Sequence, residues 1–257
     1  MISNNLGKTA LLATLLAALS VPAFANVSYN AVTDFPTITA STNPQIAYGV
    51  WSYGYATTLS PVNFSFDSTA TTDYFGDGGS AAGFYETTSG GGYGQYPLPT
   101  VLKNTTGGTI GTEGGTIGPW PANLLLLHPG PSGDYSVVQF TAPTTATYVV
   151  TGEFLAIGNF SGVTDDSVSL TSASGSSSTT LYTTTSSTTP YDFTFSQTLT
   201  AGESLDFAVG WGPGNQFAYD STGFDATITA TPEPSFYGAL ALGMSGLLVA
   251  IRRRRRA

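Results

Sequence analysis

The chain of 257 residues contains no cysteine and one histidine, His128. Without cysteine there is no disulfide bond and no thiolate metal ligand, so the fold must be stabilised by burial alone. With a single histidine, the chain has too few of the usual ligands for a zinc site, and any Ser-His-Asp catalytic site would have to include His128. His128 lies in the sequence Leu-His-Pro-Gly, which is typical of a turn, and no nucleophile-elbow pattern flanks it. We interpret it as structural or solvent-exposed.

Positive charge is nearly absent from the middle of the chain. Residues 26–231 contain fifteen Asp and Glu and one cation, Lys103, which gives a formal charge of −14. Because phosphate neutralisation needs lysine or arginine, this composition excludes nucleic acid as a partner. The acidity instead favours solubility, mutual repulsion, or divalent cations that bridge carboxylates.

The N-terminal segment has the pattern of an export signal. Lys8 precedes an apolar stretch over residues 11–19, and Ala23 and Ala25 supply the small-x-small pattern that signal peptidase reads. We expect residues 1–25 to be a signal peptide that is cleaved after Ala25. An N-terminal membrane anchor is the alternative, but the apolar stretch is too short to span a bilayer.

The C-terminal segment, residues 232–257, has three parts. Pro232, Glu233 and Pro234 come first, and an uncharged apolar run over residues 236–251 follows. The run can lie in hydrocarbon as a helix of about 24 Å, which makes it a short transmembrane span. A basic cluster on its far side would stay inside the cell. That cluster consists of Arg252, Arg253, Arg254, Arg255 and Arg256.

Between these segments, residues 26–231 have the composition of an all-β domain. Strong helix formers are scarce, whereas Thr, Val, Tyr and Phe are abundant and turn residues recur about every eight to twelve positions. We predict a jelly-roll-like antiparallel β-sandwich, because no crossover helices are available for a parallel sheet. Strands are expected over residues 50–55, 62–66, 135–141, 146–157, 166–171, 191–199, 204–210 and 224–230.

Two segments are expected outside the regular strands. Residues 76–94 are rich in glycine and tyrosine without a clear period, which indicates a long surface loop or a pair of loops. Residues 172–189 are dominated by Ser and Thr and are interrupted by a short strand over residues 180–182.

The order of Pro232-Glu233-Pro234, apolar span and arginine cluster resembles the PEP-CTERM sorting signal of bacterial exported proteins, a tail also found on some proteins labelled ice-binding. The resemblance implies an exosortase that cuts near the Pro-Glu-Pro motif and releases or transfers the exported part. The chain would then be anchored transiently in the membrane and finally lie at the cell surface or in the extracellular matrix. A permanent tail anchor is the alternative.

The middle of the chain also resembles a recurrent group of PEP-CTERM proteins. The bodies of this group are taken as β-sandwiches similar to carbohydrate-binding modules, without an established activity. The motifs that carry the resemblance lie at residues 49–55, 127–130, 138–143, 202–210 and 220–228.

Aromatic residues are the best indication of a binding function, because sugar rings stack their C–H faces on aromatic planes. Trp51 alternates with Tyr53 and Tyr55 along one predicted strand, and for these core packing is the favoured interpretation. For tyrosines in glycine-rich loops, ligand contact and burial are both open. The ligand-binding candidates are Trp51, Tyr74, Tyr85, Tyr93 and Tyr96.

These features predict a non-catalytic structural or carbohydrate-binding protein associated with exopolysaccharide. The alternative is a secreted glycan-active hydrolase, which needs two carboxylates across a cleft. Glu153, Asp192 and Asp206 lie on predicted strands, and alternation places Asp206 on the solvent side. A third hypothesis is ice binding, raised by threonines such as Thr227 and Thr229, although the sequence has no repeat of fixed period.

No cofactor is expected, with a structural calcium ion as the alternative. Carboxylate oxygens suit Ca²⁺, and the candidates are Asp165, Asp166 and Asp220. The wider set includes Asp73, Asp77 and Asp225, none at EF-hand spacing. Asx turns explain most of these aspartates more simply.

Overall fold

The computed structural model describes residues 26–59, 62–86, 96–111, 117–157, 164–185, 188–214, 217–231 and 243. In these ranges no helix has both the length and the apolar character needed to cross a membrane. The predicted signal peptide with Ala23 and Ala25, the Pro-Glu-Pro motif, the arginine cluster and, apart from Gly243, the apolar run lie outside the described residues.

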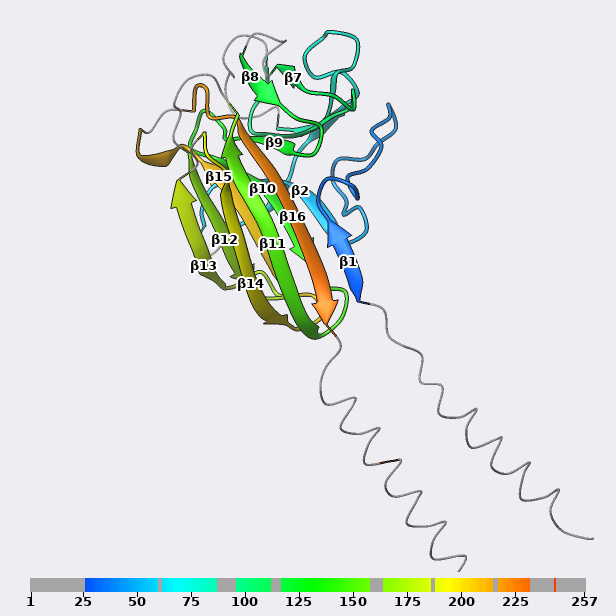
Figure 1. Cartoon of the computed structure of the whole chain (residues 1–257), viewed down its shortest axis with the longest axis vertical. Coiled ribbons are helices and arrows are strands. Elements are labelled where there is room, and N and C mark those ends of the chain that lie inside the picture. Colours follow the sequence, from blue (N-terminus) through cyan, green and yellow to red (C-terminus); the bar gives the residue numbers. More distant parts are fainter. Residues whose placement is uncertain are drawn as a thin grey trace, which may run out of the picture.

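Two antiparallel sheets form the body of the molecule (Figure 1). Sheet A has the order β14 (Tyr191–Leu199), β11 (Ala146–Ala156), β16 (Thr222–Thr231), β9 (Leu125–His128), β6 (Thr100–Asn104), β5 (Ala81–Tyr85) and β4 (Thr69–Thr71), and β1 (Val27–Asn30) also pairs with β16. Sheet B has the order β13 (Ser178–Thr185), β12 (Asp165–Thr171), β15 (Ser204–Gly210), β10 (Tyr135–Thr141), β2 (Trp51–Ala56) and β3 (Ser65–Phe66). β7 (Ile110–Gly111) and β8 (Ile117–Trp120) form a separate hairpin, and η1 (Gly212–Gly214) is a 3₁₀ turn. The predicted all-β antiparallel architecture is confirmed.

Strands with clear alternation begin and end close to where the sequence predicts. The strands predicted over residues 135–141, 191–199 and 204–210 have the bounds of β10, β14 and β15. The prediction that residues 76–94 lack regular structure is wrong, since they contain β5. The strand contains Gly83, where a Cβ would lie 2.2 Å from the carbonyl oxygen of Val101 on the neighbouring strand, so the close approach of the two strands requires glycine. Because glycine has a low strand propensity, its presence led to the prediction of a loop.

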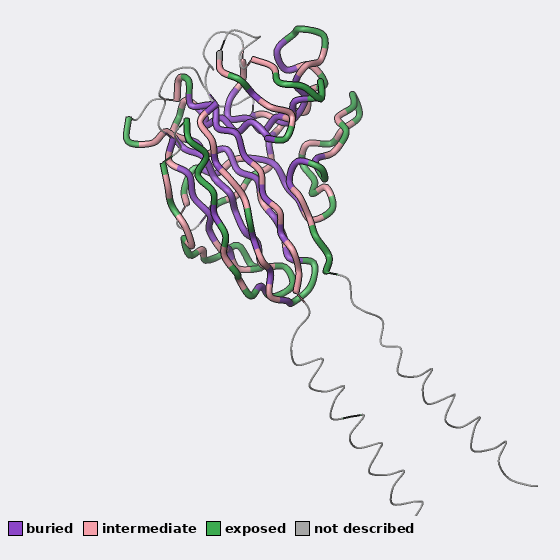
Figure 2. The backbone as a smooth tube through the Cα atoms, in the orientation of Figure 1, coloured by how far each residue is buried: buried purple, intermediate pink, exposed green. Residues whose placement is uncertain are grey.

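The main core lies between the two sheets and is built from alternate residues of their facing strands. Leu205, Phe207 and Val209 of β15 point into it, and the Phe207 and Phe224 rings lie 5.0 Å apart. Residues of the segment after β1 also enter this core, among them Val32 and Phe35. Figure 2 shows the buried backbone concentrated along these inner strands.

A second core covers part of the outer face of sheet A. Trp120 of β8, Leu102 of β6 and Leu126 of β9 pack there with Tyr74 and Phe75. From Thr147 to Glu153 of β11, and over the paired residues of β14 and β16, the outer face has no such cover among the described residues, and its outward side chains are half-buried or exposed. The two parts of sheet A therefore differ in what lies over them.

The chain enters and leaves the sandwich at the same end. Val27 of β1 pairs with Ala230 of β16, and we call this the terminus end (Figure 1). The opposite end, which we call the loop end, carries residues 96–99, 129–134, 211–214 and 217–221. The indole Nε1 of Trp211 donates to the carbonyl oxygen of Gly130, so these loops support one another.

Candidate functional site

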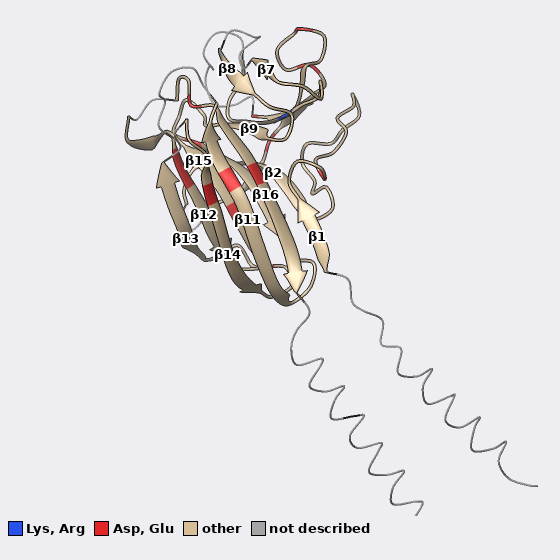
Figure 3. Cartoon of the chain, viewed as in Figure 1, with Lys and Arg blue, Asp and Glu red and all other residues tan. Residues whose placement is uncertain are grey.

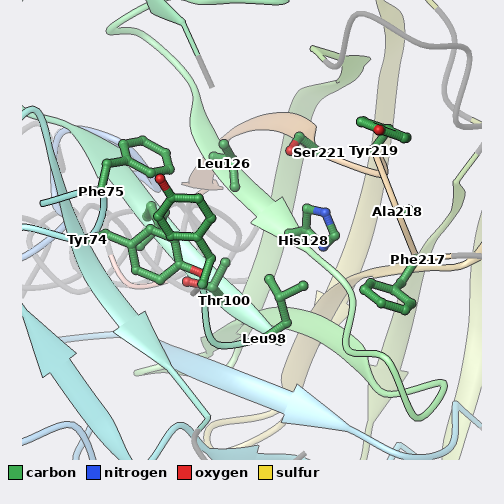
Figure 4. Close-up of a pocket in the computed structure, with 12 residues that line it drawn as sticks. Tyr74, Phe75, Leu98, Thr100, Leu126, His128, Phe217, Ala218, Tyr219 and Ser221 are labelled. Carbon is green, nitrogen blue, oxygen red and sulfur yellow. The ribbon is translucent and has the colours of Figure 1, made fainter. Parts of the chain in front are cut away.

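An aromatic pocket opens at the loop end (Figure 4). Tyr74 and Phe75 stand on one side, Phe217 and Tyr219 on the other, and His128 lies between them. The cavity volume is about 60 Å³. Its remaining lining residues are Tyr96, Leu98, Thr100, Leu102, Leu126, Ala218 and Ser221.

The structure brings three of the predicted tyrosines together: Tyr74 and Tyr96 line this pocket, and Tyr85 contacts Tyr74 without lining it. Tyr74 stacks on Tyr96 with ring centroids 5.7 Å apart, and it meets Tyr85 edge-on at 5.8 Å. Tyr74 also donates a hydrogen bond from its hydroxyl to the carbonyl oxygen of Pro97. Burial raises the pKa of Tyr74, so its hydroxyl stays protonated. Tyr93 lies outside the described residues.

Tyr219 supplies the opposite wall in an unusual backbone conformation. Its φ is 70°, in the left-handed region that costs a residue with a Cβ about 1 kcal/mol or more. The side chain is 36% exposed, which is high for a tyrosine in a pocket wall. A strained, exposed aromatic residue beside a cavity is typical of a functional position.

His128 forms the polar part of the pocket floor. It ends β9 rather than lying in the predicted turn, because Leu125–His128 pair with β6. Burial lowers the pKa of His128 to about 4, so the ring is neutral at pH 7. Nδ1 lies 2.9 Å from the carbonyl oxygen of Pro129, and because a carbonyl can only accept, Nδ1 carries the proton. Nε2 is then a hydrogen-bond acceptor in the pocket.

Trp51 lies elsewhere and does not belong to this pocket. Its side chain is 0% exposed and packs edge-on against Phe140 at 5.4 Å, which corrects its inclusion among the stacking candidates. Tyr53 is also buried in the core. The indole Nε1 of Trp51 donates to Asp34 at 3.3 Å, beside an open hollow of about 470 Å³ that Tyr48 also lines.

The hydrolase candidates do not face one another across a cleft. Glu153 is paired with Asp192 on one neighbouring strand and with Asp225 on the other, so the three carboxylates form a row on the outer face of sheet A (Figure 3). Burial, followed by the charges of Asp192 and Asp225, raises the pKa of Glu153. This geometry differs from a glycosidase pair, which flanks its substrate from two sides.

The prediction that Asp206 faces solvent is wrong. Asp206 does point away from the main core, but it is fully buried. Its carboxylate accepts hydrogen bonds from Gln139 Nε2 at 2.7 Å and from the Thr171 hydroxyl. Asp206 is therefore a structural group, because its buried carboxylate is hydrogen-bonded to side chains of the neighbouring strands β10 and β12.

Below the acidic row, hydroxyl side chains cover the outer face of β14, β11 and β16 in register. We call this surface the threonine face. It consists of three sets of residues that lie directly opposite one another on β14, β11 and β16. These sets are Thr194, Thr151 and Thr227; Ser196, Val149 and Thr229; and Thr198, Thr147 and Thr231. Eight of these nine positions carry a hydroxyl, an order that the sequence alone did not reveal because the strands are far apart along the chain.

The predicted calcium ligands Asp165, Asp166 and Asp220 all lie at the loop end, near enough for the charges of Asp165 and Asp220 to act on Asp166, but they do not converge on one point. The charges of Asp165 and Asp220 both raise the pKa of Asp166, after burial. Elsewhere, Asp73 accepts hydrogen bonds from the amides of Asp77 and Gly78, four and five residues on, so it closes a wider loop than the predicted Asx turn, whose bond spans two residues. No three His, Asp or Glu side chains in the described ranges converge as a ready-made metal site.

No protein-family model matches the chain, and no curated protein matches it. Three solved structures illustrate its structural likenesses. A family 29 carbohydrate-binding module is 6% identical over 45% of this chain and 71% of its own, with a TM-score of 0.30. The N-terminal cellulose-binding domain of Cellulomonas fimi β-1,4-glucanase C is 17% identical over 49% of this chain and 88% of its own, with a TM-score of 0.29. The C-terminal family 6 carbohydrate-binding module of LamC from Zobellia galactanivorans is 9% identical over 51% of this chain and 79% of its own, with a TM-score of 0.25. At these TM-scores the likeness carries no argument about this chain.

Proposed function

We propose that this chain is an exported, non-catalytic protein that binds carbohydrate at the aromatic pocket of its loop end. The observation that carries the proposal is the arrangement of aromatic side chains on two sides of a polar floor. Rings such as Tyr96 and Tyr219 can stack on the apolar faces of a sugar. A sugar hydroxyl can donate to Nε2 of His128, which fixes the orientation of the ligand.

The size of the cavity limits what it can hold. A volume of about 60 Å³ is well below the roughly 300 Å³ at which pockets begin to enclose small molecules. The pocket would therefore take an edge or a substituent of a sugar unit, and the rest of the polymer would lie across the exposed rings. No Asp or Glu is among the described residues that line the pocket, so these residues offer it no acid–base pair.

The terminal segments complete the proposal. Signal peptidase would remove residues 1–25, and an exosortase would act at Pro232, Glu233 and Pro234, leaving the protein at the cell surface or in an exopolysaccharide matrix. Because Val27 and Ala230 pair at the terminus end, a membrane-held chain would direct the loop end outward. That orientation suits a pocket that meets a polymer outside the cell.

The test is binding of the full chain to a panel of bacterial and plant polysaccharides in affinity gels. Tyr96→Ala should weaken binding about tenfold, because stacking contributes about 1 kcal/mol or more. Tyr219→Gly should weaken it similarly while leaving the melting temperature nearly unchanged, because glycine relieves the left-handed strain. Tyr191→Ala, an exposed tyrosine on β14, is the control and should bind normally. Unchanged binding in both pocket variants would exclude this site.

A second candidate function, contact with ice, is favoured by the threonine face. Strands lie about 4.8 Å apart and alternate residues about 6.6 Å apart, so the hydroxyls repeat in two dimensions. A flat, regular hydroxyl array can match a lattice. Thr151→Lys should abolish inhibition of ice recrystallisation, whereas Thr183→Lys on β13 should not; equal activity of the two variants would exclude the threonine face.

A further inference from the structure

Two buried carboxylate oxygens at the loop end have no hydrogen-bond donor. Asp166 is 1% exposed and Asp220 is 2% exposed. No described residue donates to Oδ2 of either side chain. Buried carboxylates are normally paired, hydrogen-bonded or bound to a metal, so both oxygens require a ligand or a proton.

The neighbouring groups show which oxygens are already used. Oδ1 of Asp166 accepts from the Thr164 hydroxyl at 3.0 Å, and that hydroxyl lies 2.9 Å from the Thr222 hydroxyl. Oδ1 of Asp165 accepts from the amide of Gly212 at 2.8 Å. Asp165 therefore holds the turn at η1, whereas the second oxygens of Asp166 and Asp220 remain for a ligand.

No side-chain cation in the described ranges compensates this negative charge. Lys103 is the only Lys or Arg in the part of the chain that the structure describes, and its Nζ donates to the carbonyl oxygen of Val32 at 2.7 Å. Burial raises the pKa of both carboxyls, and the charge of Asp165 raises both further. A cation beside Asp166 and Asp220 would compensate this buried negative charge.

We infer that Asp166 and Asp220 bind a calcium ion through their Oδ2 atoms. Calcium takes six to eight oxygen ligands in flexible geometry, and it accepts backbone carbonyls and water beside carboxylates. Zinc is a poorer fit, because it prefers nitrogen and sulfur ligands in a compact tetrahedron. Since no third carboxylate among the residues that the structure describes converges on the pair, backbone oxygens and water would have to complete the shell.

The position of Asp220 gives the ion a consequence for the aromatic pocket. Asp220 directly follows Tyr219, and Phe217 and Tyr219 form one wall of that pocket. A calcium ion that joins Asp220 to β12 would hold this loop in the conformation that presents Tyr219. This second statement, that calcium strengthens carbohydrate binding, rests on the proposed function.

The experiment is a titration of the chelator-treated full chain with CaCl₂, followed by calorimetry and thermal melting. At free calcium about a hundredfold above Kd, the melting temperature should rise by about 5–10 °C. MgCl₂ should have a smaller effect, because Mg²⁺ demands stricter octahedral geometry and loses water reluctantly. No binding heat and no shift with calcium would overturn the inference.

Substitutions locate the ion. Asp166→Asn and Asp220→Asn should each lose the calcium shift, while their calcium-free forms melt no lower than the calcium-free parent, because a neutral amide replaces a buried carboxyl whose Oδ2 has no described donor. Asp67→Asn is the matched control, since Asp67 is also buried with both carboxylate oxygens lacking a described donor. Loss of the shift in Asp67→Asn, with retention in Asp166→Asn, would place the ion elsewhere and refute the site.

Two further outcomes separate this inference from the proposed function. If calcium raises the melting temperature but no polysaccharide binds, the metal site stands and the carbohydrate proposal fails. If polysaccharide binds equally with calcium and with chelator while the melting shift is present, only the coupling through Tyr219 is refuted.

Discussion

The two ends of the sandwich satisfy their polar groups very differently. At the terminus end the hydroxyls of Thr147 and Thr198 lie 3.1 Å apart, and the Tyr148 hydroxyl donates to the carbonyl oxygen of Thr144 at 2.8 Å. At the loop end, carboxylate oxygens of Asp166 and Asp220 are buried without a described donor. The backbone strain at Tyr219 and the neutral, buried His128 lie at this end as well.

This difference shows where the fold has given up stability. A sandwich held together by strand pairing and aromatic packing has no structural need for unpaired buried carboxylates or a left-handed tyrosine. Such features persist where a ligand or an ion compensates them. We therefore place the proposed carbohydrate site and the inferred calcium ion at the loop end, and four measurements would break or sharpen the contrast between the two ends.

The largest effect should follow from removing the support of the loop-end aromatic wall. Trp120 is fully buried, its Nε1 donates to the carbonyl oxygen of Leu124 at 2.9 Å, and its ring meets Phe75. Trp120→Ala should lower the free energy of unfolding by about 3–5 kcal/mol in urea denaturation. Thr198→Ala, on the threonine face, should change it by less than about 0.5 kcal/mol. Equal effects of the two substitutions would show that the second core contributes no more to stability than the threonine face.

The second prediction compares two fully buried aspartates, one whose carboxylate accepts hydrogen bonds and one whose carboxylate has no described donor. Asp206→Asn should cost about 1.5–3 kcal/mol in urea denaturation, because Gln139 and Thr171 both donate to the Asp206 carboxylate. Asp67→Asn should cost nothing or should stabilise, because burial raises the pKa of Asp67 far above its usual value and no described group donates to it. The reverse order would contradict the contrast.

The pH dependence of stability should report the loop-end carboxyls directly. Between pH 6.5 and 8 the unfolded chain has already released the protons of Asp166 and Asp220, whereas the folded chain, with pKa values of about 8 and about 7, releases them only within this range. The folded state then binds more protons, so calcium-free stability should fall as pH rises, by about 1–2 kcal/mol. His128 opposes this slope slightly near pH 6.5, because the unfolded imidazole, with a pKa of about 6.5, still holds part of a proton that the neutral folded ring does not. Asp166→Asn should flatten the slope; an unchanged slope would contradict the assignment.

The smallest effect concerns the acidic row above the threonine face. Glu153→Lys places a cation between Asp192 and Asp225 and should stabilise by about 0.5 kcal/mol in low salt. Thr151→Lys, two residues away on the same face of β11, is the control and should give a smaller gain in stability. A loss of stability in Glu153→Lys would show that the row is not repulsive.

Sequence reasoning succeeded where a strand is long and alternates clearly, as at Tyr135–Thr141 and Tyr191–Leu199. It failed where glycine replaces a patterned residue, as at Gly83 in Ala81–Tyr85. Tyr74 and Tyr96 could be predicted as binding candidates because they lie beside glycines. Trp51, by contrast, is fully buried, because segments distant in the sequence cover it.

The amino-acid sequence by itself determined the all-β character, the absence of disulfides, the acidity and the direction of alternation along each long strand, because these depend on composition and nearest neighbours. Only the tertiary structure decided which side chains meet across strands. Thr151 pairs with Thr194 and Thr227, and Asp166 interacts with Asp220, although each of these pairs is separated by more than forty residues. Register and loop packing come from the balance of the whole core, and that balance is not encoded in any single segment.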